Sequence, residues 1–331
     1  MTLQPQWLRQ GYIDAPVPAH LDLAAEIRRM AAEKHAIILA HYYTRPEIQD
    51  IADFVGDSLA LAQHAAATDA RIIVMCGVHF MAETNKILCP DKLVICPDLN
   101  ATCSLAESCP ADAFERFVAA HPDHKVISYV NTTAATKAVT DVVVTSTNAR
   151  RIVESFPKEQ PLIFGPDSNL GGYINSVTGR NMLLWDGACH VHRRFSLAHI
   201  EALKAEHPEA KVLVHPECPA PIAAMADIVG STAALLRYAV ESPAQTFIVV
   251  TESGILHEMQ RQAPGKTFLT VATQAEGDAP AASCNACEYM RLITIEKVYN
   301  TLRYEWPAVE VDADIAKRAL KPIERMLALS K

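Results

Sequence analysis

The sequence contains no long apolar run and no strongly basic stretch. No segment reaches 18 consecutive apolar residues, which is close to the minimum length of a membrane-spanning helix. The first 18 residues lack the apolar core of a secretory signal. The formal net charge is −8 and Lys and Arg form no cluster, which disfavours nucleic-acid binding. We therefore expect a soluble, cytoplasmic protein that binds neither nucleic acid nor membranes.

Aromatic residues are also scarce, at 6% of the chain, although half of the residues are hydrophobic. The core must therefore consist mainly of Ala, Val, Ile and Leu, and 331 residues are enough to build it without covalent staples. Phosphate-binding fingerprints are missing as well. The glycine-rich segment 165–172 has neither P-loop nor dinucleotide spacing, and it is interpreted as a turn that leads into a helix.

Nine cysteines are an odd and rather high number for such a chain. Structural disulfides are disfavoured in a cytoplasmic protein, so metal binding or redox chemistry is the better interpretation of some of them. Cys76, Cys89 and Cys96 lie in or beside apolar segments, and with Cys109 they are interpreted as core residues.

Three similar segments recur along the chain with a period close to 86 residues. His41, Tyr129 and His215 end three apolar runs and are separated by 88 and 86 residues. Serines at 58, 146 and 231 follow these positions after 17, 17 and 16 residues. Such self-similarity indicates repeated structural units, and this period is too long for a solenoid. It predicts three small α/β domains around a pseudo-threefold axis, with their strand ends directed at a shared centre.

Helix-type periodicity alternates with short apolar runs throughout, which predicts βαβ units and parallel sheets. A strand is expected at 36–41, for example, followed by one helix over 47–66. Ligands in such folds bind at the carboxyl ends of the strands, which is where the polar clusters fall. We predict domains at 22–104, 105–190 and 191–290, and C-terminal helices at 291–331 that pack back on the core.

Each repeat closes on cysteine: Cys103, Cys189, and the pair Cys284 and Cys287. Three widely separated thiols without an equally placed fourth suggest a [4Fe–4S] cluster in which the protein leaves one iron unligated. Such an iron can bind substrate as a Lewis acid. A zinc site, or no metal at all, remains an alternative explanation of this spacing.

Groups suited to acid–base chemistry and to anion binding gather at the strand ends. His41, His215 and Glu217 are candidates for proton transfer, and Tyr129 and Asn131 offer neutral donors. Hydroxyl residues at 58, 146, 231 and 232 have the pattern of helix N-caps, and helix N-termini bind anions well. Hydrogen-bonded structural histidines and plain caps are the alternatives.

Several of these segments resemble the quinolinate synthase (quinolinate synthetase A) family of NAD biosynthesis. The similar segments, in order, are 41–43, 46–59, 103–106, 129–131, 165–171, 189–192 and 215–218. The resemblance covers about residues 35–303 and is specific, because many long motifs occur in the family's order.

The resemblance implies three pseudo-symmetric three-layer αβα domains with short parallel sheets around a central active site. It implies a [4Fe–4S] cluster on Cys103, Cys189 and Cys287 with one open iron site. It also implies condensation of iminoaspartate (iminosuccinate) with dihydroxyacetone phosphate to quinolinate, with release of phosphate and water. An iminoaspartate-producing enzyme is a possible transient partner.

Residue roles carry over from the same motifs. The catalytic residues implied are Glu217, His41, Tyr43 and His215. The substrate-binding positions implied are His41, Ser58, Tyr129, Val130, Asn131, Ser146, His192, His215, Pro216, Glu217, Ser231 and Thr232. One departure concerns Ala281, which stands where some members carry the first cysteine of CxxCxxC. It leaves open whether Cys284 has a redox role.

Three other protein classes are compatible with parts of this pattern. Another iron–sulfur hydro-lyase would also have an open iron. A non-catalytic iron–sulfur carrier or redox sensor would bury its cluster behind four protein ligands and would need no converging His, Glu and Ser. A zinc-stabilised binding protein is the third. Metal and sulfide analysis separates zinc from a cluster, and an assay with both substrates separates the two enzyme classes.

Overall fold

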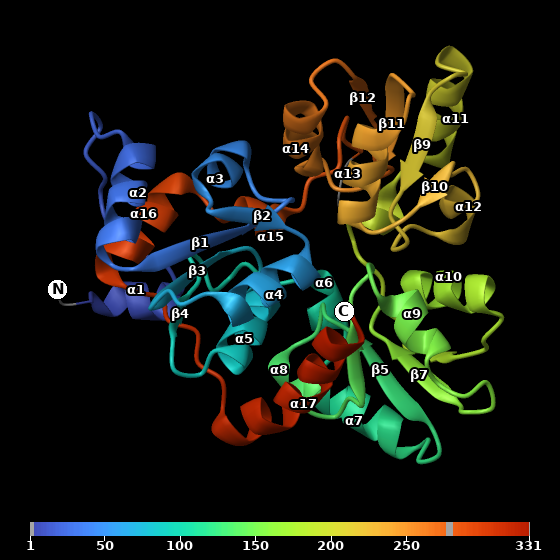
Figure 1. The fold of residues 1–331 in the computed structure, drawn as a ribbon, viewed down its shortest axis with the longest axis horizontal. Coiled ribbons are helices and arrows are strands. Elements are labelled where there is room, and N and C mark those ends of the chain that lie inside the picture. Colours follow the sequence, from blue (N-terminus) through green and yellow to red (C-terminus); the bar gives the residue numbers. More distant parts are fainter. Residues whose placement is uncertain (1–2, 276–280, 331) are drawn as a thin grey trace.

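The computed structural model describes residues 3–275 and 281–330. It contains three four-stranded parallel sheets, which lie in three lobes coloured blue to teal, green, and yellow to orange in Figure 1. In each sheet the strands follow the same spatial order, second–first–third–fourth. The predicted α/β fold of three αβα units is confirmed. We call the lobes that contain β1–β4, β5–β8 and β9–β12 units 1, 2 and 3.

Unit 1 follows a short lead-in helix. Its strands are β1 (Ala36–His41), β2 (Phe54–Gly56), β3 (Ile72–Cys76) and β4 (Leu93–Ile95). The helices before Cys103 are the lead-in helix α1 (Pro5–Gln10), α2 (Leu23–Glu33), α3 (Pro46–Ile51), α4 (Ser58–Ala67) and α5 (His79–Leu88). All five residues of β3 are buried, as expected of a central parallel strand that is covered on both faces.

Unit 2 repeats this arrangement with shorter helices. Its strands are β5 (Lys125–Tyr129), β6 (Val142–Val144), β7 (Leu162–Gly165) and β8 (Leu183–Leu184). Its helices are α6 (Ser104–Ser108), α7 (Ala111–Ala119), α8 (Ala134–Lys137), α9 (Ala149–Glu154) and α10 (Ser168–Thr178). The glycine-rich segment does lead into a helix, because Asp167 caps α10 by accepting a hydrogen bond from the backbone N–H of Leu170 at 2.8 Å.

Unit 3 contains the last sheet. Its strands are β9 (Lys211–Val214), β10 (Ile228–Val229), β11 (Thr246–Val250) and β12 (Thr267–Thr270). Its helices are η1 (His192–Arg194), α11 (Leu197–Glu206), α12 (Ala220–Ala223), α13 (Thr232–Glu241) and α14 (Ile255–Gln262). Neighbouring residues of β9 belong to separate hydrophobic clusters: Val212 and Val214 to one, Leu213 to the other. Successive side chains therefore pack on opposite faces of the sheet, as a three-layer arrangement requires.

One aspartate in each unit makes the same pair of hydrogen bonds, so the repeat in the sequence is also a repeat in the structure. Asp53, Asp141 and Asp227 are separated by 88 and 86 residues, the same separations as the strand-end residues. The carboxylate of each accepts a backbone N–H from the first strand of its unit, at 2.7, 2.8 and 2.9 Å. Each backbone N–H donates to the same strand residue in return. The second strand of every sheet is therefore held at the same register.

The helix predicted over 47–66 is wrong. The chain instead forms α3, the strand β2 and α4. Phe54 pairs with Leu39 of β1, and Asp53 ties the start of β2 to Ile38. Sheet pairing thus overrides the helical periodicity of this segment.

Two C-terminal helices pack back onto the first two units. The first, α16 (Ile295–Tyr304), lies against α2, and the second, α17 (Ala313–Leu329), contacts β6, α8 and α5 (Figure 1). The short helix α15 (Glu288–Arg291) precedes both. The domain boundaries at 104, 190 and 290 stay a prediction. The described residues contain no helix with the length and apolarity that a bilayer crossing needs.

Candidate functional site

The carboxyl ends of the strands of all three units border one central cavity. His41 ends β1, Tyr129 ends β5 and His215 directly follows β9, and all three side chains line this cavity. The convergence that the repeat predicts is therefore present. Other predicted residues that line the cavity are Tyr43, Ser58, Asn131, Ser146, His192, Glu217, Thr232, Cys103, Cys189 and Cys287.

The three cysteines come from three separate loops. Cys103 and Cys287 directly precede α6 and α15, and Cys189 lies in the loop before η1. Burial raises the pKa of the Cys103 thiol to about 11 and that of Cys287 to about 12, and it raises the pKa of Cys189 well above its usual value. The other two thiols contribute to the rise at Cys189, so the three sulfur atoms are electrostatic neighbours. Such thiols give up their protons when a metal binds them.

The cavity contains side chains that could bind a metal, and their spacing can be compared with that around a single zinc ion. Among the described residues, one group of three or more ligand atoms lies within 4.8 Å of one another, and it consists of Cys189, His192 and Glu217. Cys103 and Cys287 do not join it. Sulfur atoms on one tetrahedral zinc lie about 3.8 Å apart, given Zn–S bonds of about 2.3 Å. Cys103, Cys189 and Cys287 therefore do not all lie within 4.8 Å of one another, and a polynuclear cluster can accommodate this spacing.

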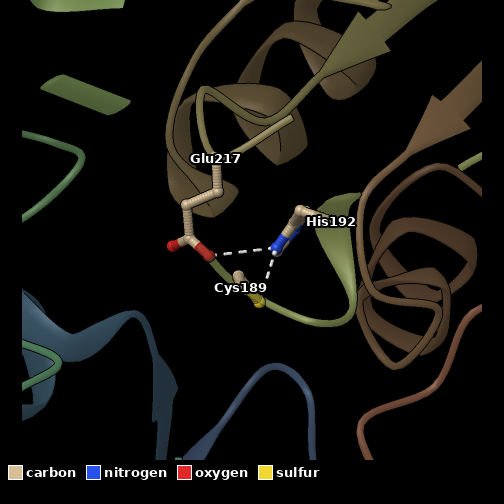
Figure 2. A group of neighbouring side chains, drawn as sticks. All are labelled: Cys189, His192 and Glu217. Atoms are coloured by element: carbon tan, nitrogen blue, oxygen red, sulfur yellow. Dashed lines mark hydrogen bonds and ion pairs between the residues drawn. The ribbon is translucent and has the colours of Figure 1, made fainter. Parts of the chain in front are cut away.

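Glu217 lies at the centre of a polar network. Tyr129 donates its hydroxyl to one carboxylate oxygen at 2.6 Å, and His192 Nδ1 lies 3.0 Å from the other. Figure 2 shows His192 between Glu217 and Cys189, whose sulfur is 3.3 Å from the same ring nitrogen. Burial raises the pKa of Glu217, but His192, His215 and the hydrogen bonds outweigh it and lower that pKa below its usual range. Glu217 is therefore a buried carboxylate rather than a carboxylic acid.

The network continues from His192 through Thr251 to Tyr43 of unit 1. Nε2 of His192 is 2.9 Å from the Thr251 hydroxyl, which is 2.7 Å from the hydroxyl of Tyr43. Tyr43 is in turn 2.8 Å from the hydroxyl of Thr232. Burial raises the pKa of Tyr43 well above its usual value, so this phenol stays protonated. Both ring nitrogens of His192 are thus used within the protein, which suits a role in orienting Glu217.

His41 and His215 share one local geometry. In each, Nδ1 accepts a hydrogen bond from the backbone N–H two residues later: Tyr43 at 3.1 Å and Glu217 at 3.4 Å. Burial lowers the pKa of both imidazoles to about 3, although the charge of Glu217 opposes the shift. Both rings are therefore neutral near pH 7, and the proton is carried by Nε2. A neutral imidazole of this kind donates a hydrogen bond and is a poor proton acceptor.

Hydroxyl and amide groups cover the wall formed by units 1 and 2. Asp57 caps α4, which begins at Ser58, and accepts a hydrogen bond from the hydroxyl of Thr147 at 2.7 Å. This contact joins the two segments that carry Ser58 and Ser146. Oδ1 of Asn131 and Oγ1 of Thr145 are buried and have no hydrogen-bond partner, and both residues line the cavity. Buried polar atoms of this kind are expected to bind a ligand or water.

Three of the predicted substrate-binding residues are absent from the lining of the cavity: Val130, Pro216 and Ser231. Val130 is buried in the hydrophobic core, where its backbone N–H donates to Val144. Ser231 caps α13 by accepting from the backbone N–H of Ala234. The roles assigned to all twelve positions stay predictions.

The cavity also contains residues that have no counterpart among the predicted site residues. Asp57 and Glu252 line it, and Thr251 connects His192 to Tyr43. Burial raises the pKa of Glu252 to about 7, although Arg291 opposes the shift. The position of Asp57 before Ser58, in a Gly-Asp-Ser motif, was a sequence signal for Asp57.

The four cysteines interpreted as core residues are buried, as expected.

Comparisons with known proteins place the chain in a family. Residues 25–328 match the family model described as quinolinate synthetase A protein. The chain is 53% identical to quinolinate synthase of Thermosynechococcus vestitus over 313 residues, which are 95% of this chain and 97% of that protein.

Further relatives show the same coverage. The quinolinate synthase of Nostoc punctiforme is 53% identical over 310 residues, 94% of each chain. That of Chloroherpeton thalassium is 51% identical over 313 residues, 95% of this chain and 96% of the relative. The range 25–328 matched by the family model spans all three units and the three cysteines. The chain belongs to the quinolinate synthetase A family.

Proposed function

We propose that this enzyme condenses iminoaspartate with dihydroxyacetone phosphate to form quinolinate, releasing phosphate and water, in NAD biosynthesis in the cytoplasm. The observation that carries the proposal is the meeting of Cys103, Cys189 and Cys287 with the Glu217 network in one cavity. The proposed substrates are small anions. The residues that line the cavity offer them hydrogen-bond donors rather than the charged side chains of Lys or Arg. A transient contact with an iminoaspartate-producing enzyme belongs to the same proposal.

Cys103, Cys189 and Cys287 are the residues that would hold a [4Fe–4S] cluster. They contribute one sulfur atom per loop and all line the cavity. When bound with one iron free of protein ligands, such a cluster offers a Lewis acid for a substrate oxygen. Cys284 is exposed and lies outside the cavity lining, so it is not one of the proposed ligands.

The neutral donors bind and orient the substrates. The Nε2–H groups of His41 and His215 are suited to carboxylate or carbonyl oxygens, because their direction is fixed by the backbone hydrogen bonds to Nδ1. Ser58 and Ser146 are suited to the phosphate, since α4 begins at Ser58 and the Asp57–Thr147 contact keeps both segments in place. Asn131, with its unpartnered oxygen, can accept from a substrate amino or hydroxyl group.

Glu217 is the proposed proton acceptor. Isomerisation, imine formation and dehydration each require a proton to leave carbon, nitrogen or oxygen, and Glu217 is the ionised carboxylate of the cavity that contacts Tyr129 and His192. Its low pKa makes Glu217 a weak base, so its basicity depends on what the substrate does to these contacts. The hydroxyl of Tyr129 can then donate a hydrogen bond to the oxygen atom that carries the remaining negative charge.

An anaerobic experiment tests the proposal directly. The protein is reconstituted with iron and sulfide, analysed for iron, sulfide and zinc, and assayed for quinolinate with freshly generated iminoaspartate and dihydroxyacetone phosphate. We expect about four irons and four sulfides per chain and quinolinate formation that requires both substrates. A cluster-loaded protein that forms no quinolinate would point to another [4Fe–4S] hydro-lyase. Zinc without sulfide would point to the zinc-stabilised class.

A further inference from the structure

Glu252 is a buried carboxylate that neither the proposed catalysis nor the proposed cluster ligands use. It lies two residues after β11 and is completely buried, yet it lines the central cavity. We propose that Glu252 is a positioning residue that holds the Cys287 loop in the geometry required to bind the cluster. The inference rests on the proposed function, because it assumes that Cys287 is a cluster ligand.

The contacts of Glu252 connect the end of a strand to the cysteine loop. One carboxylate oxygen accepts the backbone N–H of Cys287 at 3.0 Å and lies 2.9 Å from the guanidinium of Arg291. The other oxygen accepts the backbone N–H of Gly254 at 2.6 Å. Cys287 is the N-cap residue of α15 and Arg291 is the last residue of the helix, so one carboxylate fixes both ends of this short helix against unit 3.

The surroundings leave Glu252 little freedom to make other contacts. A side chain at Gly254 would begin 2.8 Å from the Glu252 carboxylate and 2.8 Å from the backbone of Tyr43. Arg291 is itself held, because its backbone carbonyl accepts a hydrogen bond from Arg45 at 3.0 Å. The carboxylate is therefore enclosed by unit 1 on one side and the cysteine loop on the other.

Unit 2 has a related arrangement, and unit 1 does not. Asp167 also lies two residues after the third strand of its unit and is completely buried. One of its oxygens caps α10, and the backbone N–H of Cys189 lies close to its carboxyl group, although the second oxygen makes no hydrogen bond. The corresponding position of unit 1 is Val78.

Both loops are also attached by backbone hydrogen bonds. In the Cys103 loop of unit 1, His79 donates its N–H to the carbonyl of Ala101 at 2.6 Å. In the Cys287 loop, Ser253 donates its N–H to the carbonyl of Asn285 at 2.9 Å, whereas the backbone N–H of Cys287 itself donates to Glu252. The contact with Glu252 therefore acts at the ligand residue itself. Outer-shell partners of metal ligands typically change metal affinity by about 10- to 100-fold.

The test compares two buried glutamates of unit 3. Glu252→Gln keeps the size of the side chain but replaces one acceptor oxygen with an NH₂ group that must face a donor. Glu258→Gln is the matched control, because Glu258 is also buried and paired with an arginine, Arg261 at 2.7 Å, and it does not line the cavity. Both variants and the wild type are reconstituted anaerobically. The rate of iron release to a chelator, the electron paramagnetic resonance spectrum of the reduced cluster, and the melting temperature of the metal-free protein are then measured.

We expect Glu252→Gln to release iron at least about 10-fold faster than wild type and to change the spectrum, while Glu258→Gln stays within about twofold. The two metal-free variants should melt at similar temperatures. Equal release rates for both variants would overturn the inference and leave the proposed function standing. A wild-type protein that takes up no iron and sulfide would overturn both.

A second variant covers the case in which Glu252→Gln does not fold. Arg291→Lys keeps the charge but not the geometry of the contact with Glu252. It should raise the release rate in the same direction by a smaller factor. A release rate equal to that of wild type would contradict a positioning role for this carboxylate.

Discussion

Units 1 and 3 end their first strands in the same backbone geometry and yet present different chemistry. His41 and His215 are both buried, and each accepts the backbone N–H of the second residue after it. That second residue is Tyr43 in unit 1 and Glu217 in unit 3. The repeat therefore sets where the side chains lie, and the residue two positions after the histidine decides what each unit contributes.

Under the proposed function, this difference separates binding from proton transfer. Tyr43 is a phenol that stays protonated and connects Thr232 to Thr251, so unit 1 contributes a donor at a fixed place. Glu217 is ionised and lies between Tyr129 and His192. Four sets of variants test this comparison of units 1 and 3. The first set concerns the cysteines, which both units must contribute.

The cysteines are the feature in which units 1 and 3 should be equivalent. We expect Cys103→Ala and Cys287→Ala to lose the cluster together with activity, by about 10³-fold or more, since a Lewis acid contributes several kcal/mol to the barrier. Cys189→Ala should behave in the same way. Iron, sulfide and quinolinate formation are measured on anaerobically reconstituted protein.

Cysteines buried in unit 1 provide the control. Cys76 and Cys96 are fully buried in the hydrophobic core, and Ala in their place should leave the cluster intact. A Cys189→Ala protein with its full iron and sulfide content would contradict the assignment of ligands.

The largest error in the predicted fold also lies in unit 1. Residues 47–66 have helical periodicity, and the three-residue strand β2 is recognised only through its pairing with β1. The repeat itself held the missing signal, because Asp53-Phe54-Val55-Gly56 matches Asp227-Ile228-Val229-Gly230. The three residues of β2 owe their strand conformation to pairing with β1 rather than to local propensity. The longer first and third strands were predictable from their apolar runs alone.

Glu217→Gln and Tyr43→Phe compare the two residues that follow the histidines. The first removes the carboxylate and should lower turnover by about 10²-fold with the cluster intact. The second removes one hydrogen-bonding hydroxyl and should cost about 10-fold or less, in line with about 1 kcal/mol for a hydrogen bond. Turnover is measured at saturating substrate beside the iron content. Near-normal turnover of Glu217→Gln would reduce this residue to a binding or structural role.

The candidate site was predictable where chemistry coincided with the repeat. Cysteines and strand-end residues were recognisable because they recur or belong to long motifs. Glu252 was missed because a single acidic residue in the segment Thr251-Glu252-Ser253-Gly254 has no local signature, and its contact with Cys287 joins residues 35 positions apart in the chain. Contacts of this kind follow from the docking of loops and not from the period of the pattern.

The two histidines should make the protein less stable in acid. Their pKa values of about 3 in the folded protein lie below about 6.5 in the unfolded chain, so the unfolded chain takes up protons first as the pH falls. Each histidine then reduces the free energy of unfolding by about 1.4 kcal/mol per pH unit between pH 6.5 and 3.

Denaturant unfolding of the metal-free protein at pH 7.5 and pH 5 measures this effect. His41→Asn and His215→Asn should each lose about 2 kcal/mol less than wild type between these two pH values. His20→Asn is the control, because His20 is exposed and should follow the wild type. Identical losses in all four proteins would show that the imidazoles of His41 and His215 are not held neutral by burial.

Cys284 should produce the smallest effect of all, and one that appears only in air. It is exposed and absent from the cavity lining, so Cys284→Ala should keep anaerobic turnover within about twofold of wild type. In air, loss of iron frees Cys287, and CxxC spacing allows a disulfide between the two. Because Ala281 offers no alternative thiol, this disulfide must use a proposed cluster ligand and compete with the cluster. The wild-type protein should therefore need reductant as well as iron and sulfide to regain activity after exposure to air, and Cys284→Ala should depend on reductant less. Mass spectrometry showing the Cys284–Cys287 disulfide in fully loaded, active protein would contradict both the competition and the assignment of Cys287.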